Sequence, residues 1–291
     1  MRHHDHIDLI DHAQANEQPL AAFQVITDTH VTGNADHEYN QNFDRALKDI
    51  MANAAGSSGI MHVGDITDHG FIEEYGELKR IIEANREGLP PILFTLGNHD
   101  VAFGNWSSRL GNYTAQTGMQ GVYHDHWIDG YHFIFLGTEQ GLERFCHLTK
   151  QQLEWLDQKL GEKASADKPV FVFLHQPLMD TVAGSLQAQN WYGVEQDKEL
   201  KQVLSKHPQA IMFTGHTHWQ LEAEHTMFDG KGETATMFNA ASVAYLWTDE
   251  DVHLTGSQGF YVEIYADKVL VRGRDFASGS WVESAQFQIN Y

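Results

Sequence analysis

Short apolar runs alternate with amphipathic segments along most of this 291-residue chain, and this alternation limits the possible folds most strongly. The apolar runs predict strands at residues 23–27, 60–63, 92–96, 131–136, 170–174 and 210–214. Between several of them, apolar residues recur every three or four positions, which predicts helices. One such helix has Leu153, Leu156 and Leu160 on its apolar face, after Thr149 and Gln152 at the spacing of a capping box. Strands that alternate with helices are typical of an α/β fold.

Two regions depart from this alternation. Residues 101–130 have no clear period and are rich in Gly, Asn and aromatic residues, so we expect a loop or small cap there. After residue 219, the apolar runs are joined by tight turns. These runs are residues 234–238, 259–265 and 268–274. They predict an antiparallel C-terminal part that completes a second sheet.

The predicted domain organisation is simple. Residues 1–19 are acidic and rich in His, and we expect them to form a flexible, solvated stretch. Residues 20–291 are expected to form one domain, with the insertion near 101–130. The single cysteine, Cys146, excludes a disulfide within the chain and a thiolate metal cluster.

The charge and hydropathy of the chain limit its function and location. Forty Asp and Glu against nineteen Lys and Arg give a formal net charge of −21, which repels nucleic-acid polymers. No apolar run approaches the roughly 18 residues that a membrane span needs, and the first residues lack the apolar stretch of a signal peptide. We therefore expect a cytoplasmic protein. The alternative is an exported or membrane-anchored protein whose targeting segment is absent from this sequence.

Potential metal ligands follow five of the predicted strands. In chain order they are Asp28 and His30, Asp65, Asn98, His175, and His216 with His218. Ligands of open α/β sheets bind beyond the carboxyl ends of the strands. A single polar residue after a strand more often caps a turn, but five such strand ends in one chain are poorly explained by chance. Carboxylate, amide and imidazole donors suit divalent Mn, Fe, Co, Ni or Zn, and these seven suffice for two ions if one carboxylate is shared.

The order of these motifs resembles that of the calcineurin-like metallophosphoesterases. The matching segments are Asp28-x-His30, Gly64-Asp65-x-x-Asp68, Gly97-Asn98-His99-Asp100, His175 and Gly215-His216-x-His218. The segment 64–70 is most similar to the bacterial branch that contains class III cyclic-nucleotide phosphodiesterases and glycerophosphodiesterases. Position 68 is Asp, whereas purple acid phosphatases carry a ligating tyrosine there. The resemblance implies a mixed α/β fold, a four-layer αββα sandwich of two mixed β-sheets flanked by helices.

The resemblance also implies a role for each matched residue. Each of two divalent ions (Mn, Fe, Zn or Co) would have four ligands. Those of the first ion would be Asp28, His30, Asp65 and His218. Those of the second would be Asp65, Asn98, His175 and His216. His99 would be the catalytic residue nearest the substrate phosphate, and Asn98 would also contact the substrate. Asp100 would orient the His99 ring. Asp68 would support the ligands without contacting an ion.

The function implied by the resemblance is hydrolysis of small phosphodiesters, such as cyclic nucleotides or glycerophosphodiesters, by in-line attack of a metal-bound hydroxide. A phosphomonoesterase or nucleotide pyrophosphatase with the same site is an alternative, and a non-catalytic scaffold is a remoter one. The expected partner is a small anionic phosphoester, and a homodimer is compatible with the sequence. Loop aromatics either form a wall beside the metals that stacks on a base, or pack the loops themselves. They include Trp106, Trp127, Trp191, Tyr245 and Trp247.

Overall fold

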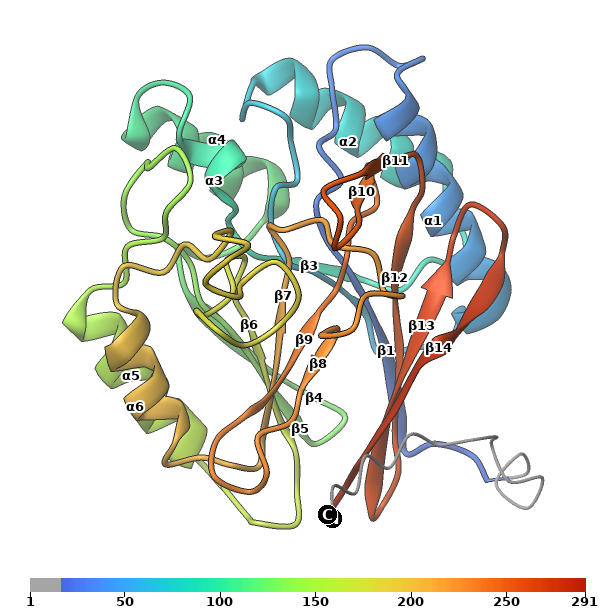
Figure 1. Ribbon diagram of the computed structural model, residues 1–291. Helices are drawn as coiled ribbons and strands as arrows, with labels where there is room; N and C mark the ends of the chain where they lie inside the picture. Colours follow the sequence, from blue (N-terminus) through green and yellow to red (C-terminus); the bar gives the residue numbers. More distant parts are fainter. Residues whose placement is uncertain (1–16) are drawn as a thin grey trace.

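Two six-stranded sheets lie face to face in the computed structural model, which describes residues 17–291 (Figure 1). The first sheet has the order β14 (Ser280–Asn290), β13 (Lys268–Asp275), β12 (Gln258–Ile264), β1 (Ala21–Ile26), β2 (Ile60–His62) and β3 (Ile92–Phe94). The second has the order β4 (His124–Ile128), β5 (Tyr131–Phe135), β6 (Val170–Phe173), β7 (Ala210–Thr214), β9 (Thr236–Asn239) and β8 (Met227–Phe228). β10 (Leu246–Trp247) and β11 (His253–Leu254) pair separately. The flexible stretch predicted at 1–19 lies outside the described residues except for its last three.

Helices cover the outer face of each sheet. The first sheet is covered by α1 (Glu38–Ala54) and α2 (Ile72–Ala84), and the second by α5 (Lys150–Gly161) and α6 (Asp197–Leu204) (Figure 1). The short α3 (Asn98–Val101) and α4 (Trp106–Thr117) follow β3. The four-layer sandwich is therefore confirmed. No helix among residues 17–291 has both the length and the apolar character that crossing a membrane requires.

The period of two along the strands separates the apolar core into layers. Phe171 and Phe173 of β6 lie in the cluster between the two sheets, where they pack against Phe23 of β1. Val170 and Val172 of the same strand lie in the cluster shared with α5 and α6. A third cluster joins the first sheet to α1 and α2. The central strands, such as β6 and β7, are thus buried on two faces, which explains why they are nearly continuously apolar.

Two of the three C-terminal runs form strands in a different sheet from the one that the sequence pattern predicts. β12 pairs antiparallel with β1, as in Phe23 opposite Val262, and β13 and β14 continue outward from it. The predicted runs 259–265 and 268–274 therefore extend the first sheet, whereas the run 234–238 joins the second sheet as β9, parallel to β7. The sequence pattern identifies such strands, but only pairing with the free edge of β1 decides to which sheet they belong.

Residues 101–130 contain regular structure. The helix α4 begins after Asn105, whose side chain accepts a hydrogen bond from the Ser108 amide, and it ends at Gly118 in the left-handed region (φ 76°). Only Tyr113 of this helix is fully buried, so its sequence carries little apolar periodicity. The strand β4 completes the region.

The capping box predicted at the start of α5 forms only in part. Thr149 accepts a hydrogen bond from the Gln152 amide as expected. The Gln152 side chain does not return to Thr149; instead it is buried, donating to the Gly137 carbonyl and accepting from the Gly137 amide. The Thr149 amide donates to the Glu139 carboxylate.

Candidate metal centre

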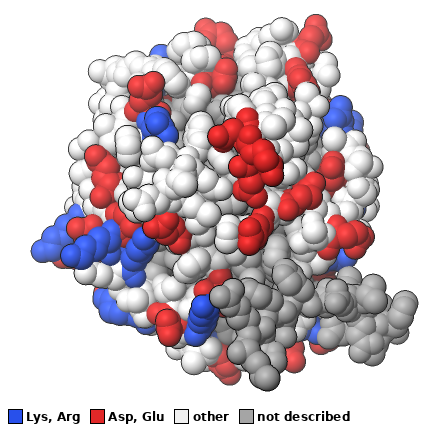
Figure 2. Space-filling model, viewed as in Figure 1, with Lys and Arg blue, Asp and Glu red and all other residues white. Residues whose placement is uncertain are grey.

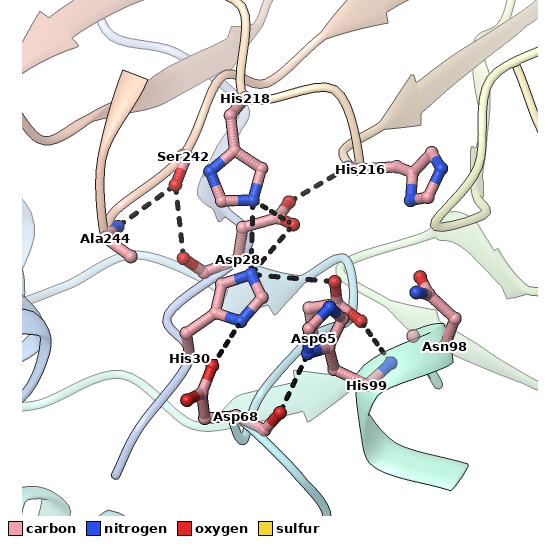
Figure 3. Close-up of polar contacts among 12 residues, drawn as sticks. Asp28, His30, Asp65, Asp68, Asn98, His99, His216, His218, Ser242 and Ala244 are labelled. Carbon is pink, nitrogen blue, oxygen red and sulfur yellow. Dashed lines mark hydrogen bonds and ion pairs between the residues drawn. The ribbon is translucent and has the colours of Figure 1, made fainter. Parts of the chain in front are cut away.

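The carboxyl ends of five strands meet at one end of the sandwich, and the residues that follow them converge there (Figures 1 and 3). β1, β2 and β3 are parallel neighbours in the first sheet, and β6 and β7 are parallel neighbours in the second. All seven residues predicted as ligands follow these strands and are at most 6% exposed. They are Asp28, His30, Asp65, Asn98, His175, His216 and His218.

Asp28, His30 and His218 form the first group of donor atoms. His218 Nε2 lies 3.0 Å from Asp28 Oδ1 and 3.1 Å from His30 Nε2. His30 Nε2 lies 3.6 Å from Asp28 Oδ1. One carboxylate oxygen and two imidazole nitrogens this close together can hold a single metal ion.

Asp65, His175 and His216 form the second group. Asp65 Oδ2 lies 3.1 Å from His175 Nε2. The same oxygen lies 3.6 Å from His30 Nε2, which belongs to the first group. Asp65 therefore lies between the two groups, where one carboxylate can serve two ions.

Four of the seven residues have a buried polar atom with no hydrogen-bond partner. These atoms are Asn98 Oδ1 and His216 Nε2, together with Asp28 Oδ1 and His175 Nε2, whose close neighbours are only the side chains of other predicted ligands. Asn98 donates from Nδ2 to the Glu143 carbonyl (2.7 Å), so only its Oδ1 remains free. A buried polar atom without a partner costs about 1–3 kcal/mol. Four such atoms together fit divalent metal ions, because oxygen and imidazole nitrogen are the donors that these ions take.

The backbone is strained at the same residues. Asp28, His30, Asp65, His216 and His218 all adopt the left-handed region, with φ between 43° and 73°. This conformation costs a non-glycine residue on the order of 1 kcal/mol and is concentrated at functional sites. Five of the seven predicted ligands therefore carry strain that the rest of the fold must offset.

The charges of the two groups are strongly coupled. Burial opposes protonation of His30, but Asp28 and Asp68 raise its pKa to about 10. Burial likewise opposes protonation of His175, but Asp65 and Asp28 raise its pKa to about 9. Burial would raise the pKa of the Asp28 and Asp65 carboxyls, but the surrounding imidazoles hold both below their usual range. The buried carboxylates therefore favour cations between the two groups, and bound metal ions would replace the protons on His30 and His175.

His99 lies beside these groups and is less buried than they are. Its ring Nδ1 is 2.8 Å from the Asp68 carbonyl oxygen, and its amide donates to Asp65 Oδ1 (2.9 Å). Nδ1 is therefore the donor toward Asp68, and Nε2 is left for another partner. The Asp68 carboxylate lies 3.2 Å from His30 Nδ1, beside a predicted ligand (Figure 3).

Asp100 does not orient the His99 ring, contrary to the prediction. Its buried carboxylate accepts hydrogen bonds from the amides of Ile66, Thr67 and Gly97 and from the Thr67 hydroxyl. Asp100 thus ties the loop after β2 to the start of α3. Burial and the nearby Asp65 carboxylate raise the pKa of Asp100 to about 6. The family resemblance implied that Asp100 orients the His99 ring, but the short helix α3 turns the two side chains in different directions.

A cleft of about 580 Å³ opens beside the two groups. Trp191, Tyr245 and Trp247, three of the aromatic residues singled out in the sequence, line this cleft. Trp106 and Trp127 do not; Trp127 stacks on His132 instead. The cleft is also lined by Phe103, Glu143 and Arg144. No sequence motif identified these three. Phe103 lies four residues after His99 and packs against its ring, whereas Glu143 and Arg144 reach the site through packing between loops that are distant in the chain.

Gly97 is required by the close approach of two loops, which leads to a testable prediction. A Cβ at this position would collide with the amide nitrogen and a side-chain oxygen of Asp65. We expect Gly97→Ala to displace Asp65, to lower the free energy of unfolding by about 1–3 kcal/mol, and to weaken metal binding. The measurements are denaturant unfolding and metal content after dialysis.

The matched control for this variant is Gly76→Ala. Gly76 lies within α2 and has open space around its Cβ position, so alanine there should leave metal binding unchanged. It should also stabilise the fold slightly, by up to about 1 kcal/mol, because alanine favours helix. Equal metal content in the two variants would contradict the role assigned to Gly97.

Comparisons with known proteins bear on the same region. A model of the calcineurin-like phosphoesterase family matches residues 22–220. A probable cyclic nucleotide phosphodiesterase of Rhodococcus erythropolis is 28% identical over 133 residues, which cover 45% of this chain and 43% of that protein. Another, of Synechococcus sp., is 28% identical over 199 residues, which cover 67% of this chain and 71% of that protein. The match thus spans less than half of the Rhodococcus protein.

Solved structures with the same fold have much lower sequence identity. A dimetal phosphatase of Danio rerio superposes with a TM-score of 0.66 at 14% identity, covering 94% of this chain and 100% of that chain. A purple acid phosphatase of yellow lupin (Lupinus luteus) superposes with a TM-score of 0.67 at 14% identity, covering 93% of this chain and 53% of that chain. At this identity, the similarity concerns the fold alone.

Proposed function

Because the chain belongs to the calcineurin-like phosphoesterase family, we propose that it is a metal-dependent phosphodiesterase that hydrolyses small phosphodiesters. Its substrates would be cyclic nucleotides or glycerophosphodiesters. The observation that carries this proposal is the convergence of six oxygen and nitrogen donors into two groups joined by Asp65, with Asn98 in the lining of the same cleft. The names of the two curated relatives favour a diester over a monoester.

Two divalent ions would occupy this site, each with four ligands. For the first ion we propose Asp28, His30, Asp65 and His218. For the second we propose Asp65, Asn98, His175 and His216. Manganese, iron, zinc and cobalt all suit these donors. When bound, the ions would neutralise charge on the phosphate oxygens and lower the pKa of water toward 7.

His99 is proposed as the general acid. Its Nδ1 is occupied by the Asp68 carbonyl, so an imidazolium at this position has Nε2–H free to donate. His99 also lines the cleft, where a substrate would lie. It would transfer this proton to the oxygen of the departing alcohol, which otherwise leaves as a less stable anion. Asp68 would hold both the His99 ring, through its carbonyl, and His30, through its carboxylate.

The main alternative, a phosphomonoesterase or nucleotide pyrophosphatase, is separated by a direct comparison of substrates. Protein purified without chelator is assayed with bis(p-nitrophenyl) phosphate and with p-nitrophenyl phosphate, each with added Mn²⁺, Fe²⁺, Co²⁺ or Zn²⁺. We expect kcat/KM to be higher for the diester, to be lost with a chelator and to be restored by a divalent ion. A higher kcat/KM for the monoester would favour the alternative, and no metal-dependent hydrolysis of either substrate would contradict the proposal.

The cytoplasmic location and the homodimer expected from the sequence remain predictions.

A further inference from the structure

Positive side chains are scarce around the cleft. Figure 2 shows several patches of acidic side chains on the viewed face, whereas Lys and Arg gather mainly beside α5 and α6. Among the described residues that line the cleft, Arg144 is the only Lys or Arg. In a chain with a net charge of −21, this one cation at the site needs an explanation.

The guanidinium of Arg144 is held in place without a carboxylate partner. It lies over the ring of Trp191, with 5.3 Å between its Cζ and the ring centroid. Its Nη2 donates to the Asn190 carbonyl (3.1 Å). Within residues 17–291, no ion pair involves Arg144, although Glu143 is its neighbour in the chain. Its other N–H groups are therefore available to a ligand.

The segment that carries Arg144 is tied to the metal centre. The Glu143 carbonyl accepts from Asn98 Nδ2, and the Arg144 carbonyl accepts from Gln176 Nε2 (3.3 Å). A Cβ on Gly193 would approach the Arg144 carbonyl to 2.9 Å, so this segment packs closely against the one that carries Trp191. Trp191 in turn borders His216, with 6.2 Å between ring centroids. Arg144 is thus fixed one aromatic ring away from a predicted metal ligand.

We propose that Arg144 is a specificity-determining residue that binds a second anionic group of the substrate. This inference rests on the proposed function. The phosphate being hydrolysed would lie at the metal ligands, and Arg144 lines the same cleft with its guanidinium over Trp191, so an ester substituent that lies along the cleft can reach it. A guanidinium binds phosphate or carboxylate oxygens through two parallel hydrogen bonds, and a neutral substituent would leave these donors unused. The substrate class is therefore narrowed to phosphodiesters whose substituent carries a phosphate or carboxylate, and a cyclic mononucleotide, which has only one phosphate, would not use Arg144.

The test uses pairs of substrates that differ only in this second group. Thymidine 5′-(p-nitrophenyl phosphate) is compared with the same diester bearing a 3′-phosphate, and ethyl p-nitrophenyl phosphate with its carboxyethyl analogue. Wild type should prefer the anionic member of at least one pair, and that pair identifies the group. Arg144→Gln should reduce this preference about tenfold or more, mainly through KM, because a charged hydrogen bond is lost. Arg144→Lys should restore part of it, because the charge returns without the planar fork.

Lys163→Gln is the matched control. Lys163 also lies over a tryptophan, 5.2 Å from the ring centroid of Trp127, but it does not line the cleft. The Lys163→Gln substitution removes one positive charge and one cation–aromatic contact. A change in substrate preference shared by Lys163→Gln and Arg144→Gln would therefore reflect net charge alone. An unchanged preference in Arg144→Gln, or equal losses for both members of each pair, would overturn the proposal.

A binding measurement separates this proposal from the proposed function. Calorimetry of the metal-loaded protein compares thymidine 3′,5′-bisphosphate with thymidine 5′-phosphate, and carboxyethyl phosphate with ethyl phosphate, in wild type and Arg144→Gln. If wild type hydrolyses no diester, the proposed function fails, but tighter binding of the anionic member that disappears in Arg144→Gln still supports the role of Arg144. Equal affinities in both pairs would overturn it.

Discussion

Asp65→Ala is expected to empty both metal positions and to reduce kcat/KM by on the order of 10³-fold or more. Asp65 Oδ2 lies 3.1 Å from His175 Nε2 and 3.6 Å from His30 Nε2, so its removal takes one ligand from each group. The remaining imidazoles would lose the carboxylate that balances their charge. Metal content after dialysis, together with diester hydrolysis at saturating metal, measures both effects.

Asp129→Ala is the matched control for this variant. Asp129 has nearly the same left-handed backbone as Asp65 (φ 52° against 50°), but it is exposed in the turn between β4 and β5. Alanine in the left-handed region has the same conformational cost at both positions, about 1–2 kcal/mol. A difference in metal content between the two variants therefore reports the loss of the Asp65 carboxylate. Full metal occupancy in Asp65→Ala would show that the two groups do not share this residue.

His99→Ala is expected to keep both metal ions and to lose about 10²–10⁴-fold in kcat. The His99 ring contacts the Asp68 carbonyl, and Nε2 remains for the substrate. The loss should be larger for a diester with an alkyl leaving group than for one with p-nitrophenolate, because a poor leaving group depends more on the donated proton. Metal content and the dependence of rate on leaving group are measured together.

His225→Ala controls for the loss of a histidine as such. The His225 side chain is 43% exposed and does not line the cleft, so turnover should be unchanged. If metal content fell equally in His99→Ala and Asp65→Ala, the separation of a proton donor from the metal ligands would be wrong. A loss in His99→Ala that did not depend on the leaving group would contradict the role as general acid.

Local sequence patterns were sufficient to predict the strands on which the site is built. The apolar runs that became β1, β2, β3, β6 and β7 are followed by polar donors, and parallel strands bring their carboxyl ends to one edge. For this reason, residue type and chain order alone predicted that Asp28, Asp65 and His216 lie near one another. The strand β14 was missed, since its apolar residues alternate with polar ones without a clear boundary.

The partner of each side chain depended on the tertiary structure. Asp100 follows His99 directly in the chain, yet its carboxylate contacts the amides after β2, and the His99 ring contacts the Asp68 carbonyl. Arg109, the arginine within the inserted region, donates to the Phe103 carbonyl, whereas Arg144 lines the cleft. Hydrogen bonds and ring contacts depend on where a short turn directs a side chain, and adjacent positions do not specify this.

By itself, the amino-acid sequence determined the α/β alternation, the donor atoms and their order, because period and residue type are local properties of the chain. The tertiary structure alone decided that the C-terminal strands extend the first sheet, that Asp65 lies between two groups of donors, and that Arg144 lies over Trp191. These facts arise from contacts between segments far apart in the chain. Such contacts depend on how whole layers pack together, and no single segment of the sequence specifies that packing.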